Sequence, residues 1–120
     1  MNSGTDSGQT PLIDKPQHQS MADALGEAFD SLVADFLGNC GEFETRLSNQ
    51  AVAGNADGFR EICHEIKGSA ALLGFSGIAS CAADWENGAR NGKVPPVAVI
   101  QEVFSRMVED TQTLMTSQAV

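Results

Sequence analysis

The sequence predicts an all-α fold, an antiparallel four-helix bundle with a short or bent additional helix at its N-terminal side. From Met21 onward, apolar residues recur at spacings of three and four, the period of a helix with one buried face. No stretch alternates apolar and polar residues with the period of two that is typical of a strand. The chain has 120 residues, which is enough for one hydrophobic core but not for two.

The first twenty residues differ in composition from the rest. Residues 1–20 are rich in Ser, Gly, Gln, Thr and Pro and show no hydrophobic period. This composition predicts a flexible N-terminal tail or an interdomain linker, followed by a helical bundle over residues 21–120. The N-terminus lacks the charged and then apolar pattern of a signal peptide, and no apolar run is long enough for a membrane-spanning helix.

The front of the bundle carries an interrupted apolar stripe. The stripe consists of Met21, Leu25, Ala28, Phe29, Leu32, Val33 and Phe36. Gly38, Asn39 and Gly41 interrupt it before it resumes at Phe43. We therefore expect either two helices or one sharply bent helix in this region.

Three further helices follow. Asn55 is a candidate N-cap for a helix whose apolar stripe is Phe59, Ile62, Cys63, Ile66, Ala70 and Leu73, and Gly74 is expected to end that helix. Ser76 is expected to cap the next helix, which should close at Asn91 and Gly92. Pro95 and Pro96 suit the first turn of the last one. Short connections make these sequential neighbours antiparallel.

Charge and cysteine usage exclude several classes of function. The formal net charge of −9 opposes any broad electrostatic contact with nucleic acid or an anionic membrane. The three cysteines are widely spaced and are interpreted as reduced thiols of a cytoplasmic protein. Cys63 and His64 are adjacent, so on a helix their side chains diverge by about 100° and do not readily share a metal. No phosphate-binding glycine loop or catalytic serine motif is present.

His64 stands out on the helix that follows Asn55. With about 100° per residue, the apolar stripe lies within roughly 40° of the core direction, whereas His64 lies at about 140° and Gly68 at about 180°. Arg60 is one turn before His64 and Lys67 is one turn after it. A lone exposed histidine is commonly an ordinary surface residue. However, a glycine inside a helix costs about 0.5–1 kcal/mol relative to alanine, so Gly68 indicates a need for space beside His64.

The residues from 64 to 74 carry a family resemblance. The run His64-Glu-Ile-Lys67-Gly68-Ser69-Ala70-Ala71-Leu-Leu-Gly74 resembles the signature of histidine phosphotransfer domains: a histidine, two residues, Lys-Gly, small residues, then a hydrophobic residue and a glycine. The resemblance covers about residues 21–118 and implies the helical bundle predicted above.

The resemblance implies a phosphorelay intermediate that is not itself an enzyme. Such a domain takes a phosphoryl group from an aspartate of one receiver domain and gives it to an aspartate of another. His64 would be the phosphorylated residue, through Nε2, and Lys67 would offset the phosphate charge. We expect Arg60, Gly68, Ser69 and Ala71 to serve receiver docking and access. No cofactor is expected in this chain, because magnesium belongs to the partner receiver.

Glu86 matches the position from which a side chain on the following helix often contacts the histidine in this family. On a helical wheel it lies about 80° from Ile78, at the edge of the core face. A carboxylate there would accept a hydrogen bond from Nδ1–H of His64 and fix its tautomer. The other interpretation is a solvated glutamate at the boundary of the core, and the spacing alone leaves both open.

The expected partners are receiver domains of response regulators or of a hybrid sensor kinase, with no nucleic acid and no direct membrane contact. We expect a monomer in the cytoplasm, either alone or as the cytoplasmic end of a membrane-bound hybrid kinase. The alternative is a helical module that docks on receiver or kinase domains without carrying phosphate. Intact His64, Lys67 and Gly68 favour the carrier.

Overall fold

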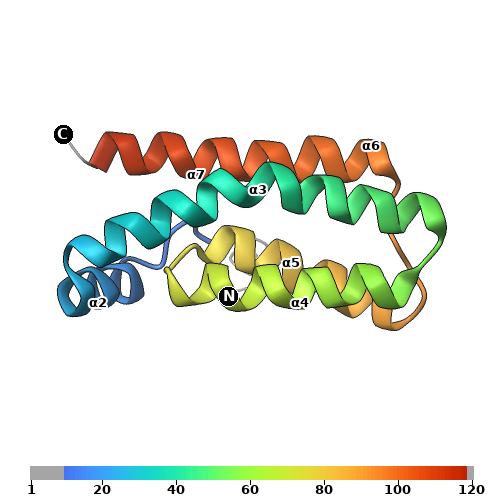
Figure 1. Ribbon diagram of the computed structural model, residues 1–120, viewed down its shortest axis with the longest axis horizontal. Coiled ribbons are helices and arrows are strands. Elements are labelled where there is room, and N and C mark those ends of the chain that lie inside the picture. The colour runs from blue at the N-terminus through green and yellow to red at the C-terminus, as the bar shows by residue number, and fades with distance from the viewer. Residues whose placement is uncertain (1–9, 119–120) are drawn as a thin grey trace, which may run out of the picture.

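The computed structural model describes residues 10–118, and within this range it contains helices and turns but no strand (Figure 1). The first four helices are α2 (Lys15–Leu25), α3 (Glu27–Ala53), α4 (Ala56–Leu72) and α5 (Ser76–Arg90). The last helix runs continuously through α6 (Val97–Val99), a π-helical segment η1 (Ile100–Phe104) and α7 (Ser105–Gln118). The predicted all-α class is confirmed.

Four long helices enclose one core. In Figure 1, α4 and α5 lie along one side of the molecule, α3 and the last helix lie along the other, and the short α2 packs at the start of α3. The largest side chains buried between them include Phe59, Phe75, Phe104, Leu47, Ile66, Ile78 and Ile100. This arrangement is the four-helix bundle with a short additional helix that the hydrophobic period predicts.

The apolar stripe of α4 determines which face of this helix remains outside. All six residues of the predicted stripe are buried, from Phe59 to Leu73. Asn55 caps the helix as predicted, because its side-chain oxygen accepts a hydrogen bond from the Gly58 amide at 3.0 Å. His64 therefore projects from the face opposite the core, where the sequence places it.

The predicted N-cap of α5 is wrong, and so is one of the two alternatives for the front of the bundle, a helix break at residues 38–41. The N-cap position of α5 is Phe75, whereas Ser76 is the first residue of the helix and its hydroxyl donates to the Pro11 carbonyl at 2.8 Å. The helix break at the front lies at Gly26, which has a positive φ of 58°, and α3 runs unbroken through residues 38–41. Burial of Phe36, Cys40 and Phe43 outweighs the propensity cost of the nearby glycines, which is about 1 kcal/mol each.

Ordered structure also begins earlier than predicted. Residues 1–9 of the expected tail lie outside the described residues, but residues 10–14 form an extended strap across the α4–α5 turn. The Asp14 amide donates to the Gly74 carbonyl at 2.7 Å, and the Gly77 amide donates to the Leu12 carbonyl at 3.1 Å. Ile13 is buried, and Asp14 caps α2. Backbone hydrogen bonds hold this strap, so its side chains need no hydrophobic period.

His18, which the sequence assigns to the tail, anchors α2 instead. Its Nδ1–H donates to the Leu73 carbonyl at 2.8 Å, and its ring packs edge-on against Phe29 with the ring centres 4.8 Å apart. The backbone of His18 lies so close to Gly74 that a Cβ at Gly74 would meet it at 2.8 Å. Gly74 also has a positive φ of 82°. Two independent constraints therefore require glycine at this turn.

Gly74→Ala should destabilise the fold more than Gly92→Ala. Gly92 also has a positive φ, of 79°, but no atom lies within 4 Å of the Cβ position there. We expect Gly92→Ala to lower the free energy of unfolding by about 1 kcal/mol through backbone strain alone. Gly74→Ala adds the collision with α2 and should cost about 1–2 kcal/mol more. Urea denaturation of both variants measures the difference, and equal losses would contradict the close approach of α2.

Candidate functional site

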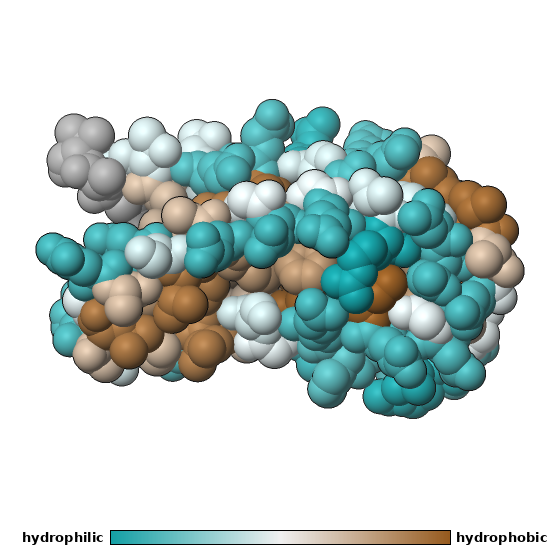
Figure 2. Space-filling model, viewed as in Figure 1, coloured by the Kyte–Doolittle hydropathy of each residue, from teal (hydrophilic) through white to brown (hydrophobic). Residues whose placement is uncertain are grey.

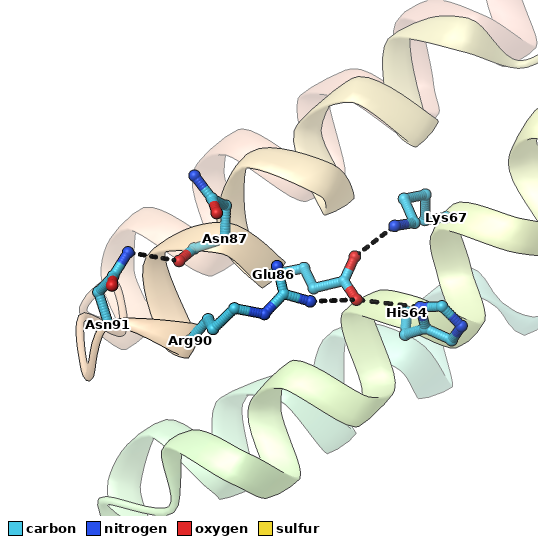
Figure 3. Close-up of polar contacts among 6 residues, drawn as sticks. All are labelled: His64, Lys67, Glu86, Asn87, Arg90 and Asn91. Atoms are coloured by element: carbon cyan, nitrogen blue, oxygen red, sulfur yellow. Dashed lines mark hydrogen bonds and ion pairs between the residues drawn. The ribbon is translucent and has the colours of Figure 1, made fainter.

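His64 presents an oriented imidazole on the surface of α4. Its side chain is 70% exposed, and its Nδ1 lies 2.9 Å from Oε2 of Glu86 on α5. An ionised carboxylate only accepts hydrogen bonds, so Nδ1 carries the proton and, in the neutral ring, Nε2 keeps its lone pair. Figure 3 shows the second ring nitrogen pointing away from the carboxylate. The nucleophilic nitrogen of the ring therefore faces outward.

Glu86 is the buried centre of this site. Its side chain is only 5% exposed, and both carboxylate oxygens have partners. Lys67 Nζ lies 2.6 Å from Oε1, and a guanidinium nitrogen of Arg90 lies 3.6 Å from Oε2 on the same helix (Figure 3). A buried charge needs such compensation, because removal from water costs several kcal/mol.

The partners of Glu86 keep it ionised. The hydrogen bond from Lys67 holds the pKa of the Glu86 carboxyl below its ordinary value of 4.5, and the hydrogen bond from His64 acts in the same direction. Burial alone would raise the pKa of this carboxyl. The site at neutral pH therefore holds an acceptor that fixes the ring of His64.

Small residues surround His64 on α4. Gly68 and Leu72 follow it at intervals of four residues and so lie along one line on the helix surface. Gly68 and Ala71 are exposed, and Ser69 is half-buried. A Cβ at Gly68 would meet no atom within 4 Å, so no contact within the described residues requires glycine there. Nothing on α4 therefore obstructs approach to His64 from this direction.

Apolar surface adjoins this end of α4. Figure 2 shows brown surface gathered over α2, the beginning of α3 and the end of α4. The large exposed apolar side chains on these elements are Leu25, Leu32 and Leu72. Exposed apolar patches beside polar groups are typical of protein-binding surfaces.

Cations gather around His64 although the chain is acidic. Of the seven Lys and Arg residues, four lie on or beside the site, namely Arg46, Arg60, Lys67 and Arg90. Arg46 on α3 forms an ion pair at 3.2 Å with Glu65, the neighbour of His64. Arg60 is half-buried one turn before His64. Three of these four cations are paired with Glu65 or Glu86, so the charge around His64 is close to balanced although the chain as a whole carries −9.

The structure brings together three of the seven predicted site residues and adds Arg90 to them. His64, Lys67 and Glu86 form one hydrogen-bonded cluster, so Glu86 contacts the histidine rather than solvent. Lys67 is held by Glu86, a pairing that the sequence analysis did not predict. Arg90 was missed altogether, although its spacing of four residues from Glu86 was a signal that could have identified it.

The rest of the described chain does not meet the requirements of a three-ligand metal site or of a membrane-spanning helix. Across residues 10–118, no group of three or more His, Cys, Asp or Glu side chains could hold a metal ion. No helix in the same range is long and apolar enough to cross a membrane. Cys63 precedes His64 but is buried in the core, and this burial raises the pKa of its thiol to about 12.

Comparison with known proteins identifies the family. The model of the Hpt domain matches residues 31–114, which is most of the chain. The chain belongs to the Hpt domain family. The phosphorelay protein LuxU of Vibrio cholerae is 25% identical over 100 residues, covering 82% of this chain and 88% of LuxU. This Hpt domain is a phosphotransfer intermediate of two-component signalling.

The fold of the Hpt domain matches that of a solved structure. Histidine-containing phosphotransfer protein B from Pseudomonas aeruginosa superposes with a TM-score of 0.80 at 21% identity. The match covers 90% of this chain and 94% of the other. Proteins of such phosphorelays interact with kinase and receiver partners.

The stability of this Hpt domain should depend on the ionisation of Glu86. Its pKa is lower in the folded chain than in the unfolded chain, so its contribution is fully present above the ordinary value of 4.5. This contribution is lost as the pH falls through the lower folded value. Between pH 6 and about 3, stability should fall more steeply for the wild type than for Glu86→Gln, with all other acids unchanged. Parallel profiles of unfolding free energy would contradict the stabilised carboxylate.

Proposed function

We propose that His64 is the phosphorylated residue of this Hpt domain. It accepts a phosphoryl group through Nε2 from an aspartyl phosphate on one receiver domain and passes it to an aspartate on another. One observation carries the proposal: His64 is an exposed imidazole whose Nδ1 is held by a buried carboxylate while its Nε2 faces outward. A neutral imidazole nitrogen with a free lone pair is a nucleophile.

The reaction needs few groups from this chain. The Nε2 lone pair forms a bond to phosphorus as the P–O bond to the donor aspartate breaks, and the donor leaves as a carboxylate. Glu86 accepts the Nδ1 hydrogen bond and stabilises the positive charge that develops on the ring. In the second transfer the P–N bond breaks, its electron pair returns to Nε2, and a P–O bond forms with the acceptor. Phosphoryl transfer depends chiefly on such positioning and on charge neutralisation.

Lys67 is proposed to offset the charge of the phosphoryl group. It lies one turn from His64 on α4, and its ammonium is already at the site, 2.6 Å from Glu86 Oε1. A lysine ammonium is a compact cation on a flexible stem, suited to a phosphate whose position changes during transfer.

The receiver is proposed to dock over the line of His64, Gly68 and Leu72. Gly68 and Ala71 leave space for the backbone of the partner, Leu72 adds apolar contact at 50% exposure, and Ser69 lines the same turn. Arg60 at the other end adds a positive charge that suits the acidic pocket of a receiver.

The remaining chemistry is assigned to the partner. We infer that the acidic pocket and its magnesium ion belong to the receiver, and that this chain is a carrier with no kinase site of its own. A monomer acting in the cytoplasm fits this role, with receivers of response regulators or of a hybrid kinase as partners.

Incubation with a phosphorylated receiver tests the proposal. Wild-type chain should gain acid-labile, alkali-stable label, as expected for phosphohistidine, and His64→Gln should gain none. The chain has two histidines, and His18→Gln should keep the label, because His18 anchors α2 and lies outside the His64 cluster. Label on His64→Gln, or its absence from the wild type, would contradict the proposal and favour a docking module that carries no phosphate.

Gly68→Gln should separate stability from transfer. Glutamine is a better helix former than glycine and meets no atom there, so the free energy of unfolding should rise by about 0.5 kcal/mol. Transfer from a receiver should nevertheless slow by about tenfold or more, because the side chain occupies space that the partner needs.

Gly41→Gln is the control for this experiment. Gly41 is also exposed within a helix with open space at its Cβ, but it lies beside α7, away from His64. It should gain similar stability and transfer at the normal rate. Unchanged transfer in Gly68→Gln would show that the receiver does not approach this surface.

A further inference from the structure

We propose that phosphorylation of His64 draws Lys67 from Glu86 to the phosphoryl group, and that Arg90 then replaces Lys67 on the Glu86 carboxylate. This inference rests on the proposed function, because it requires a phosphoryl group on His64. It makes Arg90 a positioning residue that acts through Glu86.

Lys67 cannot serve both anions in its present position. The phosphoryl group would be attached at Nε2, the ring nitrogen that points away from Glu86 (Figure 3). The imidazole ring therefore separates the new anion from the carboxylate, and Lys67 Nζ lies on the carboxylate side, 2.6 Å from Oε1. A phosphoryl group carries about two negative charges near neutral pH, against one on Glu86. The stronger attraction moves the ammonium towards the phosphoryl group.

Departure of Lys67 would leave the buried Glu86 carboxylate without its closest cation. Its side chain is 5% exposed, so water does not replace the lost cation. Oε1 would lose its ion pair, and only the Nδ1–H contact to Oε2 would remain as a short polar contact. With Nδ1–H retained, the phosphorylated ring carries one positive charge against about two negative charges on the phosphoryl group. The site therefore gains net negative charge while Oε1 has lost its cation, so the carboxylate needs another one.

Arg90 is placed to supply that cation. It follows Glu86 by one turn on α5, and its guanidinium nitrogen lies 3.6 Å from Oε2. This distance exceeds the roughly 2.7–2.9 Å of a charge-assisted hydrogen bond, so the pair can still tighten. The side chain is 59% exposed and approaches from the side opposite Lys67 (Figure 3). A guanidinium presents parallel donors that match both oxygens of a carboxylate, including the oxygen that Lys67 leaves.

This replacement affects one state of the protein more than the other. In the unphosphorylated chain Lys67 neutralises Glu86, and Arg90 contributes little at 3.6 Å. In the phosphorylated chain Arg90 carries that role, which frees Lys67 for the phosphoryl group. Removal of Arg90 should therefore disfavour the phosphorylated form while leaving the unphosphorylated fold unchanged.

Chemical phosphorylation tests the inference without a protein partner. The full chain is incubated with fixed concentrations of phosphoramidate and ammonium until the phosphorylated fraction, read by ³¹P NMR, is constant. Arg90→Gln should lower the ratio of phosphorylated to unphosphorylated chain roughly two- to fivefold, the range of a partly exposed ion pair. Arg90→Lys should restore part of the ratio, because it keeps the charge but lacks the parallel donors of the guanidinium. Arg106→Gln on α7 removes the same charge at a position away from Glu86 and should leave the ratio unchanged. The thermal midpoint of unphosphorylated Arg90→Gln should equal that of the unphosphorylated wild type.

The same measurement in a Glu86→Gln variant distinguishes whether Arg90 acts through the carboxylate or directly on the phosphoryl group. If Arg90 works through the carboxylate, Arg90→Gln should no longer change the ratio once residue 86 is neutral. An equal effect in both backgrounds would mean that Arg90 contacts the phosphoryl group directly, and no effect in either would mean that Lys67 alone suffices. Both results overturn the inference. A wild-type chain that is not phosphorylated on His64 would instead refute the proposed function and this inference with it.

Discussion

A single buried carboxylate constrains the whole site. Glu86 lies between α4 and α5 with almost no access to water, so it must be compensated by groups from the protein. The two groups in close contact with it, His64 and Lys67, come from α4, whereas Arg90 on α5 lies farther away at 3.6 Å. The compensation therefore ties the two helices together and at the same time fixes which nitrogen of His64 faces outward. Stability and chemistry depend here on the same contacts.

The inner and outer faces of α4 have different roles. The inner face of this helix is continuously apolar and holds it in the bundle, so its outer face is free of packing demands. Gly68 on that outer face lowers the stability of the helix relative to alanine, and no contact within the described residues requires glycine there. The positive charges stand beside the small residues rather than among them. A partner thus meets open space in the middle and charge at the rim.

Features that depend on a single helix could be predicted from the sequence. The stripe from Phe59 to Leu73 determined the outward direction of His64, and Asn55 and Gly74 marked the ends of α4. Features that depend on contacts between different elements could not be predicted. The strap at residues 10–14 is held by backbone hydrogen bonds that leave no side-chain pattern. Likewise, a helical wheel gives the direction of Glu86, but neither its burial nor its contacts with His64 and Lys67.

The short α4–α5 turn places the reactive residues on one helical hairpin. His64 and Glu86 are 22 residues apart in sequence and sit on adjacent helices joined by residues 73–75. All groups of the reactive cluster therefore belong to one helical hairpin. The helices that flank it, α2, α3 and α7, can change their outer surfaces without disturbing the reactive nitrogen. Substitutions on those outer surfaces would leave the hydrogen bonds and ion pairs of the hairpin in place, and the fold as a whole is retained at 21% identity with a TM-score of 0.80.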